Sequence, residues 1–303
     1  MNSNRALIAT AWEVTNRNKR YIVWFYVLNL MLGISAAMIF GTKVGAVLNH
    51  SLSADKLLHG FDLPVLVELI ARPDFGPTGV VSFATLTSGL LFLIASLIFM
   101  PGVFLGYSSD HCISRGEFYR ACGHNLWRFV RLFVYFAIVA GIVGGILSGI
   151  QGALVKAADE NSYELLPFIT QMVGWTVIFL VLSVIRIWFD LAQADVVLRD
   201  QSATRKSIAA GYRMSRGNMG KLLGTYVLIA IVALIVLSVG IVLWNMIVPA
   251  ASVFGAFLIS QVMLLLLLAV RFWQRAAAVS FYLRAKSEPT ASESAHLVPA
   301  TAV

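Results

Sequence analysis

The sequence predicts an all-α polytopic membrane protein, with six transmembrane helices arranged as three repeated units of an interfacial helix plus a helical hairpin. Three observations lead to this prediction. Of the 303 residues, 59% are hydrophobic and 13% are charged, whereas about a quarter of the residues in a soluble domain carry a charge. Six apolar stretches are each long enough to cross about 30 Å of hydrocarbon. The approaches to the first, third and fifth stretches share a pattern of residues.

The predicted spans are runs of roughly 20 or more apolar residues. They cover residues 22–41, 80–107, 132–152, 165–185, 222–246 and 253–270. The second span contains Pro101 and Gly102, and because proline removes a backbone hydrogen bond we expect this span to tilt or kink. The first span follows a basic segment, as a secretory signal would, but it is long enough to cross the membrane and its approach recurs inside the chain.

The distribution of Lys and Arg predicts the orientation, because cytoplasmic flanks are enriched in these residues. With both termini in the cytoplasm, 19 of the 23 basic residues lie on that side, in four segments. Those segments are residues 1–21, 108–131, 186–221 and 271–303. The translocated loops then carry only Lys43, Lys56, Arg72 and Lys156. The net charge of +8 therefore indicates an anionic inner leaflet as partner, and not nucleic acid.

The predicted topology also bears on the cysteines and on the domain boundaries. Cys112 and Cys122 both fall on the cytoplasmic side, where disulfides are rare, so we expect two free thiols. A transmembrane domain is expected over residues 1–285, followed by a disordered cytoplasmic tail over residues 286–303, which has no apolar face to bury. Within the domain, the three repeats are placed at about 5–107, 115–185 and 205–285.

The repeat rests on asparagines that precede the odd-numbered spans, Asn18, Asn125 and Asn218. An aromatic residue stands six positions before each one: Trp12, Tyr119 and Tyr212. The ends of two even-numbered spans also match, because "VIRIWFDLAQADVVLR" at 184–199 aligns with "AVRFWQRAAAVSFYLR" at 269–284. Matches at the same topological points indicate duplication of one structural unit.

The approach to each odd span is interpreted as an elbow between two helices. Residues 5–15 place Leu7 and Ala11 on one apolar face, as expected of a helix lying on the membrane surface. Gly217 can end such a helix, and Asn218 can cap the next one by accepting hydrogen bonds from its first amides. The alternative at each copy is one continuous helix with a polar cytoplasmic extension.

The stretch "DLAQADVVLRDQSATRKSIAAGYRMSRGNMGKLL" at 190–223 resembles bacterial six-span proteins related to the membrane domain of glycerophosphodiester phosphodiesterases. The resemblance lies in a V-L-x-D-x-S turn followed by a helix and an R-G-N elbow. The matching residues are Val197, Leu198, Asp200, Ser202, Arg216, Gly217 and Asn218. In that family the phosphodiesterase chemistry resides in a separate soluble domain after the spans. Only "SEPTASESAHLVPATAV" follows them here, so the resemblance implies a membrane protein without that activity.

Two sets of polar residues near or within the spans are candidate sites. Arg186 and Asp190 are four residues apart, as are Arg271 and Arg275. These can serve as gating ion pairs, or the arginines can anchor at the headgroups while Asp190 pairs locally or with Arg275. Inside the spans the notable polar residues are Asn29, Gln171 and Gln261, which we expect to form hydrogen bonds between helices.

The third span has a stripe of small residues, Gly141, Gly145 and Gly149, which favours close packing of helices. In the large translocated loop, His50, Asp55, His59, Asp62 and Glu68 offer metal-binding groups, but their spacing fits no metal signature. Asp62 before Leu63-Pro64 is better interpreted as the N-cap of a short helix. We therefore expect no metal and no cofactor.

These observations favour a non-enzymatic inner-membrane scaffold or accessory protein that interacts with anionic lipid headgroups or partner proteins through its basic cytoplasmic face. A transporter or permease component for a small or lipid-like solute is the alternative, and it requires a polar cavity reaching Asn29, Gln171 or Gln261. An intramembrane lipid-modifying enzyme is the third hypothesis, and it requires acids and histidines clustered at one interface. The sequence has no nucleophile, base and acid constellation and no phosphate-binding loop.

Overall fold

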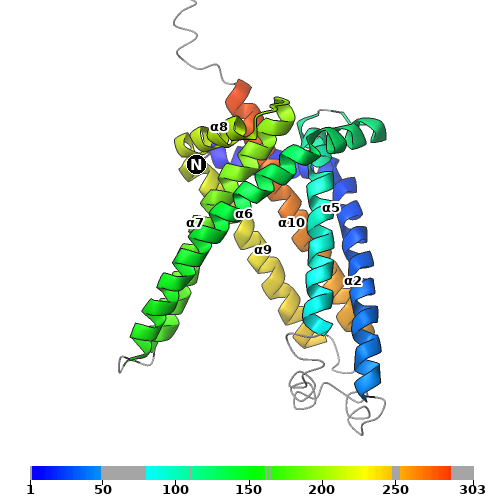
Figure 1. Ribbon diagram of the computed structural model, residues 1–303, viewed down its shortest axis with the longest axis vertical. Helices are drawn as coiled ribbons and strands as arrows, with labels where there is room; N and C mark the ends of the chain where they lie inside the picture. The colour runs from blue at the N-terminus through cyan, green and yellow to red at the C-terminus, as the bar shows by residue number, and fades with distance from the viewer. Residues whose placement is uncertain are drawn as a thin grey trace, which may run out of the picture. The chain divides into compact units, whose positions relative to one another are not determined.

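The computed structural model of the chain describes residues 2–48, 80–109, 111–160, 163, 165–247 and 253–287. These residues form helices, and none of them belongs to a strand. The helices are α1 (Asn2–Arg17), α2 (Lys19–Leu48), α5 (Val80–Ser108), α6 (Arg115–Asp159), α7 (Leu165–Leu198), α8 (Thr204–Gly217), α9 (Met219–Ile247) and α10 (Val253–Ser287). Figure 1 shows them in chain order by colour.

Six of these helices are long and apolar enough to cross a membrane, as the sequence predicts: α2, α5, α6, α7, α9 and α10. Three of them extend well beyond the length that a span requires. With a rise of 1.5 Å per residue, the 45 residues of α6, the 34 of α7 and the 35 of α10 exceed the 20 or so that cross the hydrocarbon. Pro101 lies inside α5, which continues past it to Ser108.

The chain divides into two compact units. The first unit comprises residues 1–17, 100–229 and 273–303, and its core is formed by the ends of α5, α7, α9 and α10 together with α1, α8 and the start of α6. Its fully buried large side chains include Phe104, Phe129, Phe189, Leu191 and Tyr226. In this unit α6 and α7 form a hairpin, and α8 packs along the end of α7 (Figure 1).

The second unit comprises residues 18–99 and 230–272. Phe25 is its central aromatic residue and makes edge contacts with Phe92, Phe99 and Phe272 at centroid separations of 6.1, 6.4 and 5.0 Å. Gly240 is buried against Met263, so that α9 and α10 approach closely at this point. Contacts between aromatic and apolar side chains therefore join the helices in the part of this unit that the structure describes.

The packing of α8 on α7 depends on small residues. The buried side of α8 consists of Thr204, Ser207, Gly211 and Ser215, spaced three or four apart as one helical face. At Gly211 an added Cβ atom would lie 2.8 Å from the Trp188 carbonyl oxygen. The backbones of α7 and α8 therefore lie nearly in contact at Gly211, and a residue with a side chain would not fit there unless one helix shifted.

The small-residue stripe of α6 does not pack as the sequence predicts. A Cβ atom placed at Gly141, Gly145 or Gly149 would find no atom within 4 Å among the described residues, whereas one at Gly144 would meet Leu182 of α7 at 3.8 Å. The contact with α7 therefore lies on a neighbouring face of α6. The predicted stripe is exposed within the part of the chain that the structure describes.

Candidate functional site

The last three turns of α7 contain two buried carboxylates, at Asp190 and Asp195. Almost every residue from Ile187 to Val196 is buried, because this part of α7 has neighbours all around it. A buried carboxylate needs hydrogen bonds to replace those it had to water. Each of the two obtains one from a tyrosine hydroxyl and lies near one arginine.

Asp190 connects α7 to α9. The hydroxyl of Tyr226 donates to Asp190 Oδ2 over 2.8 Å, and Arg186 Nε lies 3.7 Å from the same oxygen. This agrees with the local pairing expected from the four-residue spacing. Arg275 of α10 is near enough to interact electrostatically with the Tyr226 hydroxyl. Arg271, one turn earlier, is exposed.

Asp195 connects α7 to α10 in the same manner. The hydroxyl of Tyr282 donates to Asp195 Oδ1 over 2.7 Å, and Arg199 Nε lies 3.4 Å from that oxygen. Sequence reasoning missed both the Asp195–Tyr282 and the Asp190–Tyr226 pair, whose partners are 87 and 36 residues apart. One signal was present in the sequence: these are the two acidic residues within the apolar stretch 165–199, where a lone carboxylate requires a partner.

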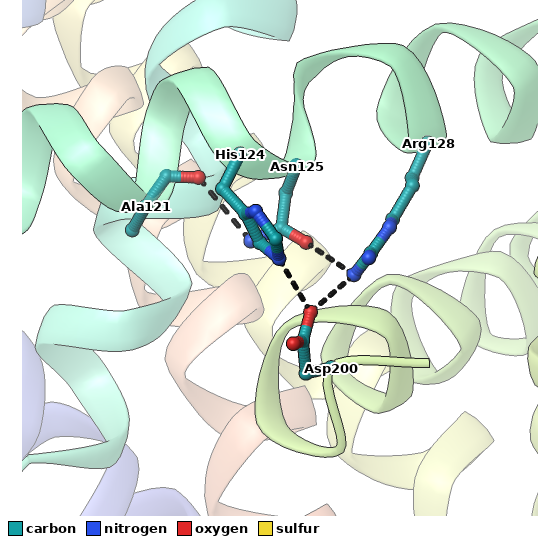
Figure 2. Close-up of polar contacts among 5 residues, drawn as sticks. All are labelled: Ala121, His124, Asn125, Arg128 and Asp200. Carbon is teal, nitrogen blue, oxygen red and sulfur yellow. Dashed lines mark hydrogen bonds and ion pairs between the residues drawn. The ribbon is translucent and has the colours of Figure 1, made fainter. Parts of the chain in front are cut away.

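A second polar cluster lies at the surface of the first unit, between α6 and the connection from α7 to α8 (Figure 2). His124 Nε2 lies 2.8 Å from Asp200 Oδ1, and Arg128 Nη1 donates to that same oxygen. Arg128 also donates to Asn125 Oδ1 over 3.1 Å. The hydrogen bonds from Arg128 and His124 lower the pKa of the Asp200 carboxyl below its ordinary value.

Asn125 does not start a membrane span, which corrects the sequence prediction for the second repeat. Helix α6 is continuous from Arg115 to Asp159 and begins instead with a capping box formed by Ser114 and Glu117. The Asn125 side chain donates to the Ala121 carbonyl over 3.2 Å and accepts from Arg128. Since both polar atoms are engaged within the helix, the side chain cannot cap the amides that follow.

The other two elbow positions do separate helices. Helix α1 ends at Arg17 and α2 begins at Lys19, with Asn18 buried between them. Helix α8 ends at Gly217 and α9 begins at Met219, and the Asn218 carbonyl accepts from the Leu222 amide over 3.1 Å. Gly217 has a negative φ, so the break does not require a left-handed glycine. Capping by the Asn218 side chain stays a prediction.

Two tryptophans hold α1 and α8 through main-chain contacts. Trp188 Nε1 on α7 donates to the Ile208 carbonyl of α8 over 2.7 Å, and Trp273 Nε1 on α10 donates to the Ile8 carbonyl of α1 over 3.1 Å. The ring of Trp188 meets Tyr212 at a centroid distance of 5.3 Å. Trp273 likewise meets Trp12 at 5.1 Å. Both short helices are thereby fixed to the end of a long one.

The predicted intramembrane polar residues have different environments. In the second unit Tyr26 donates to Gln261 Oε1 over 3.3 Å, which joins α2 to α10, and Asn29 is half-buried on α2. In the first unit the side chain of Gln151 donates to the main-chain carbonyl of Gln171 over 3.2 Å. The partner on α6, Gln151, was not anticipated. The Gln261 contact matches the expected role, whereas at Gln171 the main-chain carbonyl takes part and not the side chain.

Two cysteines and five loop residues carry side chains that can bind a metal ion. Neither Cys112, which is exposed, nor Cys122, which is buried, forms a disulfide, in agreement with the expectation of two reduced thiols. The loop residues His50, Asp55, His59, Asp62 and Glu68 lie outside the described residues. Within the described ranges, no three His, Cys, Asp or Glu side chains converge closely enough to hold a metal ion.

Exposed basic residues occur on the short helices and at the start of α6. Arg5 and Arg17 are exposed on α1, and Arg115 and Arg120 on α6. Helix α8 adds four more: Arg205, Lys206, Arg213 and Arg216. We refer to these eight residues as the basic set.

Comparison of the chain with models of known families, with curated proteins and with solved structures finds no match.

Proposed function

We propose that this chain is a non-enzymatic scaffold or accessory protein of the bacterial inner membrane, which binds anionic lipid headgroups through the basic set and thereby organises lipid or partner proteins. The observation that carries the proposal is the combination of exposed basic and exposed aromatic side chains on the same helices. Trp12, Tyr119 and Tyr212 are 50%, 54% and 46% exposed and lie on α1, α6 and α8, the three helices that carry the basic set. Aromatic rings with polar edges favour the headgroup region, where basic side chains attract anionic lipid.

We further propose that the architecture consists of three repeats related by duplication. The aligned tryptophans Trp188 and Trp273 donate to carbonyls at the aligned positions Ile208 and Ile8, which supports equivalent roles for α8 and α1. For the second repeat the support is the contact of the start of α6 with α5, where Gly102 lies against Phe118. Each interfacial segment would then pack on the return span of another repeat.

The proposed interaction is tested by lipid retention. The protein is purified into nanodiscs with phosphatidylcholine alone or mixed with phosphatidylglycerol, and bound lipid is measured by native mass spectrometry. Replacement of Arg205, Lys206, Arg213 and Arg216 by Gln should lower the preference for phosphatidylglycerol several-fold, because each basic residue near an anionic surface contributes about 1 kcal/mol. The matched control replaces Lys43, Lys56, Arg72 and Lys156, which the sequence assigns to the other side, with the same change of net charge. Equal effects of the two variants would refute the proposal.

A transporter or permease component is the second candidate, and the buried Asp190 and Asp195 are the observation that favours it. Ionisable groups buried in membrane helices often mark pathways for ions or protons. Here each carboxylate already has a tyrosine and an arginine nearby, which fits a structural role equally well. Proton flux in proteoliposomes that is abolished by Asp190→Asn or Asp195→Asn in a folded protein would favour the transporter over the scaffold.

A further inference from the structure

The cluster of His124, Asn125, Arg128 and Asp200 brings two donors from one helix onto a single carboxylate oxygen (Figure 2). We refer to these four residues as the clamp. His124 Nε2 and Arg128 Nη1 both contact Asp200 Oδ1. Two donors one turn apart on α6, converging on one anionic oxygen, form an arrangement that suits any oxyanion.

One donor of the clamp, the Arg128 guanidinium, has a contact that does not depend on Asp200. Asn125 is 5% exposed, and its amide nitrogen is tied to the Ala121 carbonyl. Its Oδ1 in turn accepts from Arg128 Nη1, and the Arg128 side chain is only 17% exposed. The guanidinium therefore keeps its position through the Asn125 contact even when a different anion occupies the place of the carboxylate.

The acceptor side is far less constrained. Asp200 has a side chain that is 66% exposed, and it belongs to the short connection between α7 and α8. Its φ angle is 49°, in the left-handed region that aspartate tolerates better than most residues. Both contacts to the clamp use Oδ1. An exposed carboxylate on a short connection, in an uncommon backbone conformation, is a group that a stronger anion can displace.

The neighbouring residues on α6 suit the headgroup region of a membrane. Trp127 is 64% exposed, and the guanidinium of Arg131 lies 5.5 Å from the centroid of its ring. The apolar, lipid-length part of α6 follows directly. An exposed tryptophan beside a basic residue at the end of a span is typical of a membrane–water boundary, so that phosphate groups of lipids lie at this level.

We infer that His124 and Arg128 form a phosphate-binding site in which the Asp200 carboxylate is a resident competitor. A phosphate presents separate oxygens to the two donors and binds arginine more strongly than one carboxylate oxygen does. Its binding displaces Asp200 and releases the connection between α7 and α8. This inference rests on the proposed function and deepens it, because lipid binding then changes the attachment of α8, which carries half of the basic set.

The test compares variants that break the same contact from opposite sides. Arg128→Gln removes the donor, and Asp200→Asn removes the competing charge. Lys156→Gln is the matched control, since Lys156 is an exposed basic residue of the same helix that belongs to neither the clamp nor the basic set. Arg128→Lys, which keeps the charge without the planar fork, guards against a folding defect in the glutamine variant. Binding of phosphatidylglycerol in phosphatidylcholine nanodiscs is measured by native mass spectrometry, and amide hydrogen exchange is followed over residues 199–203.

The site predicts effects of opposite sign. Asp200→Asn should raise the affinity for phosphatidylglycerol about threefold or more, and Arg128→Gln should lower it by a similar factor, with Arg128→Lys in between and Lys156→Gln nearly unchanged. In the wild-type protein, phosphatidylglycerol should speed exchange at 199–203. Inorganic phosphate added to phosphatidylcholine nanodiscs separates the sources of the ligand: faster exchange with inorganic phosphate indicates a soluble phosphate ligand, and faster exchange with the lipid alone indicates a headgroup.

Changes of the same sign in Asp200→Asn and Arg128→Gln would overturn the inference, because they would show that the clamp only ties α6 to the connection. If the fourfold glutamine variant of α8 still loses phosphatidylglycerol in that case, the proposed function stands and only the phosphate site fails. If wild-type protein shows no preference for the anionic lipid, the proposed function and this inference fail together.

Discussion

Replacement of Gly211 by alanine tests the close approach of α8 to α7. An added Cβ atom would lie 2.8 Å from the Trp188 carbonyl oxygen, 2.9 Å from the Ala192 amide nitrogen and 3.2 Å from the Ala192 Cα atom. Ordinary contacts of a Cβ atom begin at about 3.4 Å. All three neighbours are main-chain atoms, so no side-chain rotation can relieve the overlap. Helix α8 must therefore shift away from α7.

The expected magnitude follows from two opposing terms. Overpacking of this kind costs about 1–3 kcal/mol. Alanine also favours a helix over glycine by about 1 kcal/mol, which partly offsets the cost. Gly123→Ala is the matched control, because Gly123 lies within α6 and has no atom within 4 Å of its added Cβ. The propensity gain is common to both variants, so Gly211→Ala should be less stable than Gly123→Ala by about 1–3 kcal/mol.

Equilibrium unfolding in mixed detergent micelles measures this difference, and hydrogen exchange along α8 locates it. The shift should also weaken the hydrogen bond from Trp188 to the Ile208 carbonyl, so the amides of α8 should exchange faster. The reasoning is wrong if Gly211→Ala proves as stable as Gly123→Ala, since the backbones would then have room for a methyl group.

Three further predictions concern the buried pairs, the elbow and the topology. Tyr226→Phe and Tyr282→Phe should each destabilise the protein by about 1.5–3 kcal/mol, because each removes a hydrogen bond to a buried carboxylate, whereas Tyr163→Phe at an exposed position should be neutral in the same unfolding assay. Asn218→Ala should cost roughly 0.5–2 kcal/mol while Asn218→Ser and Asn218→Asp cost less, and an alanine variant as stable as the serine variant would exclude side-chain capping. Single cysteines at Asp55 and Ser292, in a variant without Cys112 and Cys122, should react with impermeant reagents from outside and inside respectively, and the reverse pattern would invert the orientation.

The sequence was sufficient to predict the six spans, because a run of 20 apolar residues has few alternatives to crossing the membrane. It was also sufficient for the ends of α1 and α8, where polar residues interrupt the pattern at Asn18 and Asn218. At Asn125 the same signal failed. There the asparagine binds Ala121 and Arg128 within its own helix, and this competition depends on side-chain geometry that spacing does not reveal.

The candidate sites were less predictable from the sequence. The Arg186–Asp190 pair follows from the four-residue periodicity of one helix. By contrast, Asp195 and Tyr282 meet only because α7 and α10 pack side by side, and His124 meets Asp200 only because the connection after α7 returns to α6. Contacts between distant segments depend on helix packing, for which a single sequence carries no periodic signal. The same limit applies to the exposed glycines of α6, whose pattern predicts close packing but not its partner.

The contact of Trp273 with the Ile8 carbonyl can form only late in the synthesis of the chain. The two residues are 265 positions apart, so α1 leaves the ribosome long before the segment that fixes it has been made. Until α10 has been inserted, Ile8 and Trp12 lack their contacts with Trp273. Helix α1 can therefore make this contact only after every intervening span has been translated. A product that terminates before Trp273 would leave this helix loosely attached, where membrane proteases can recognise it.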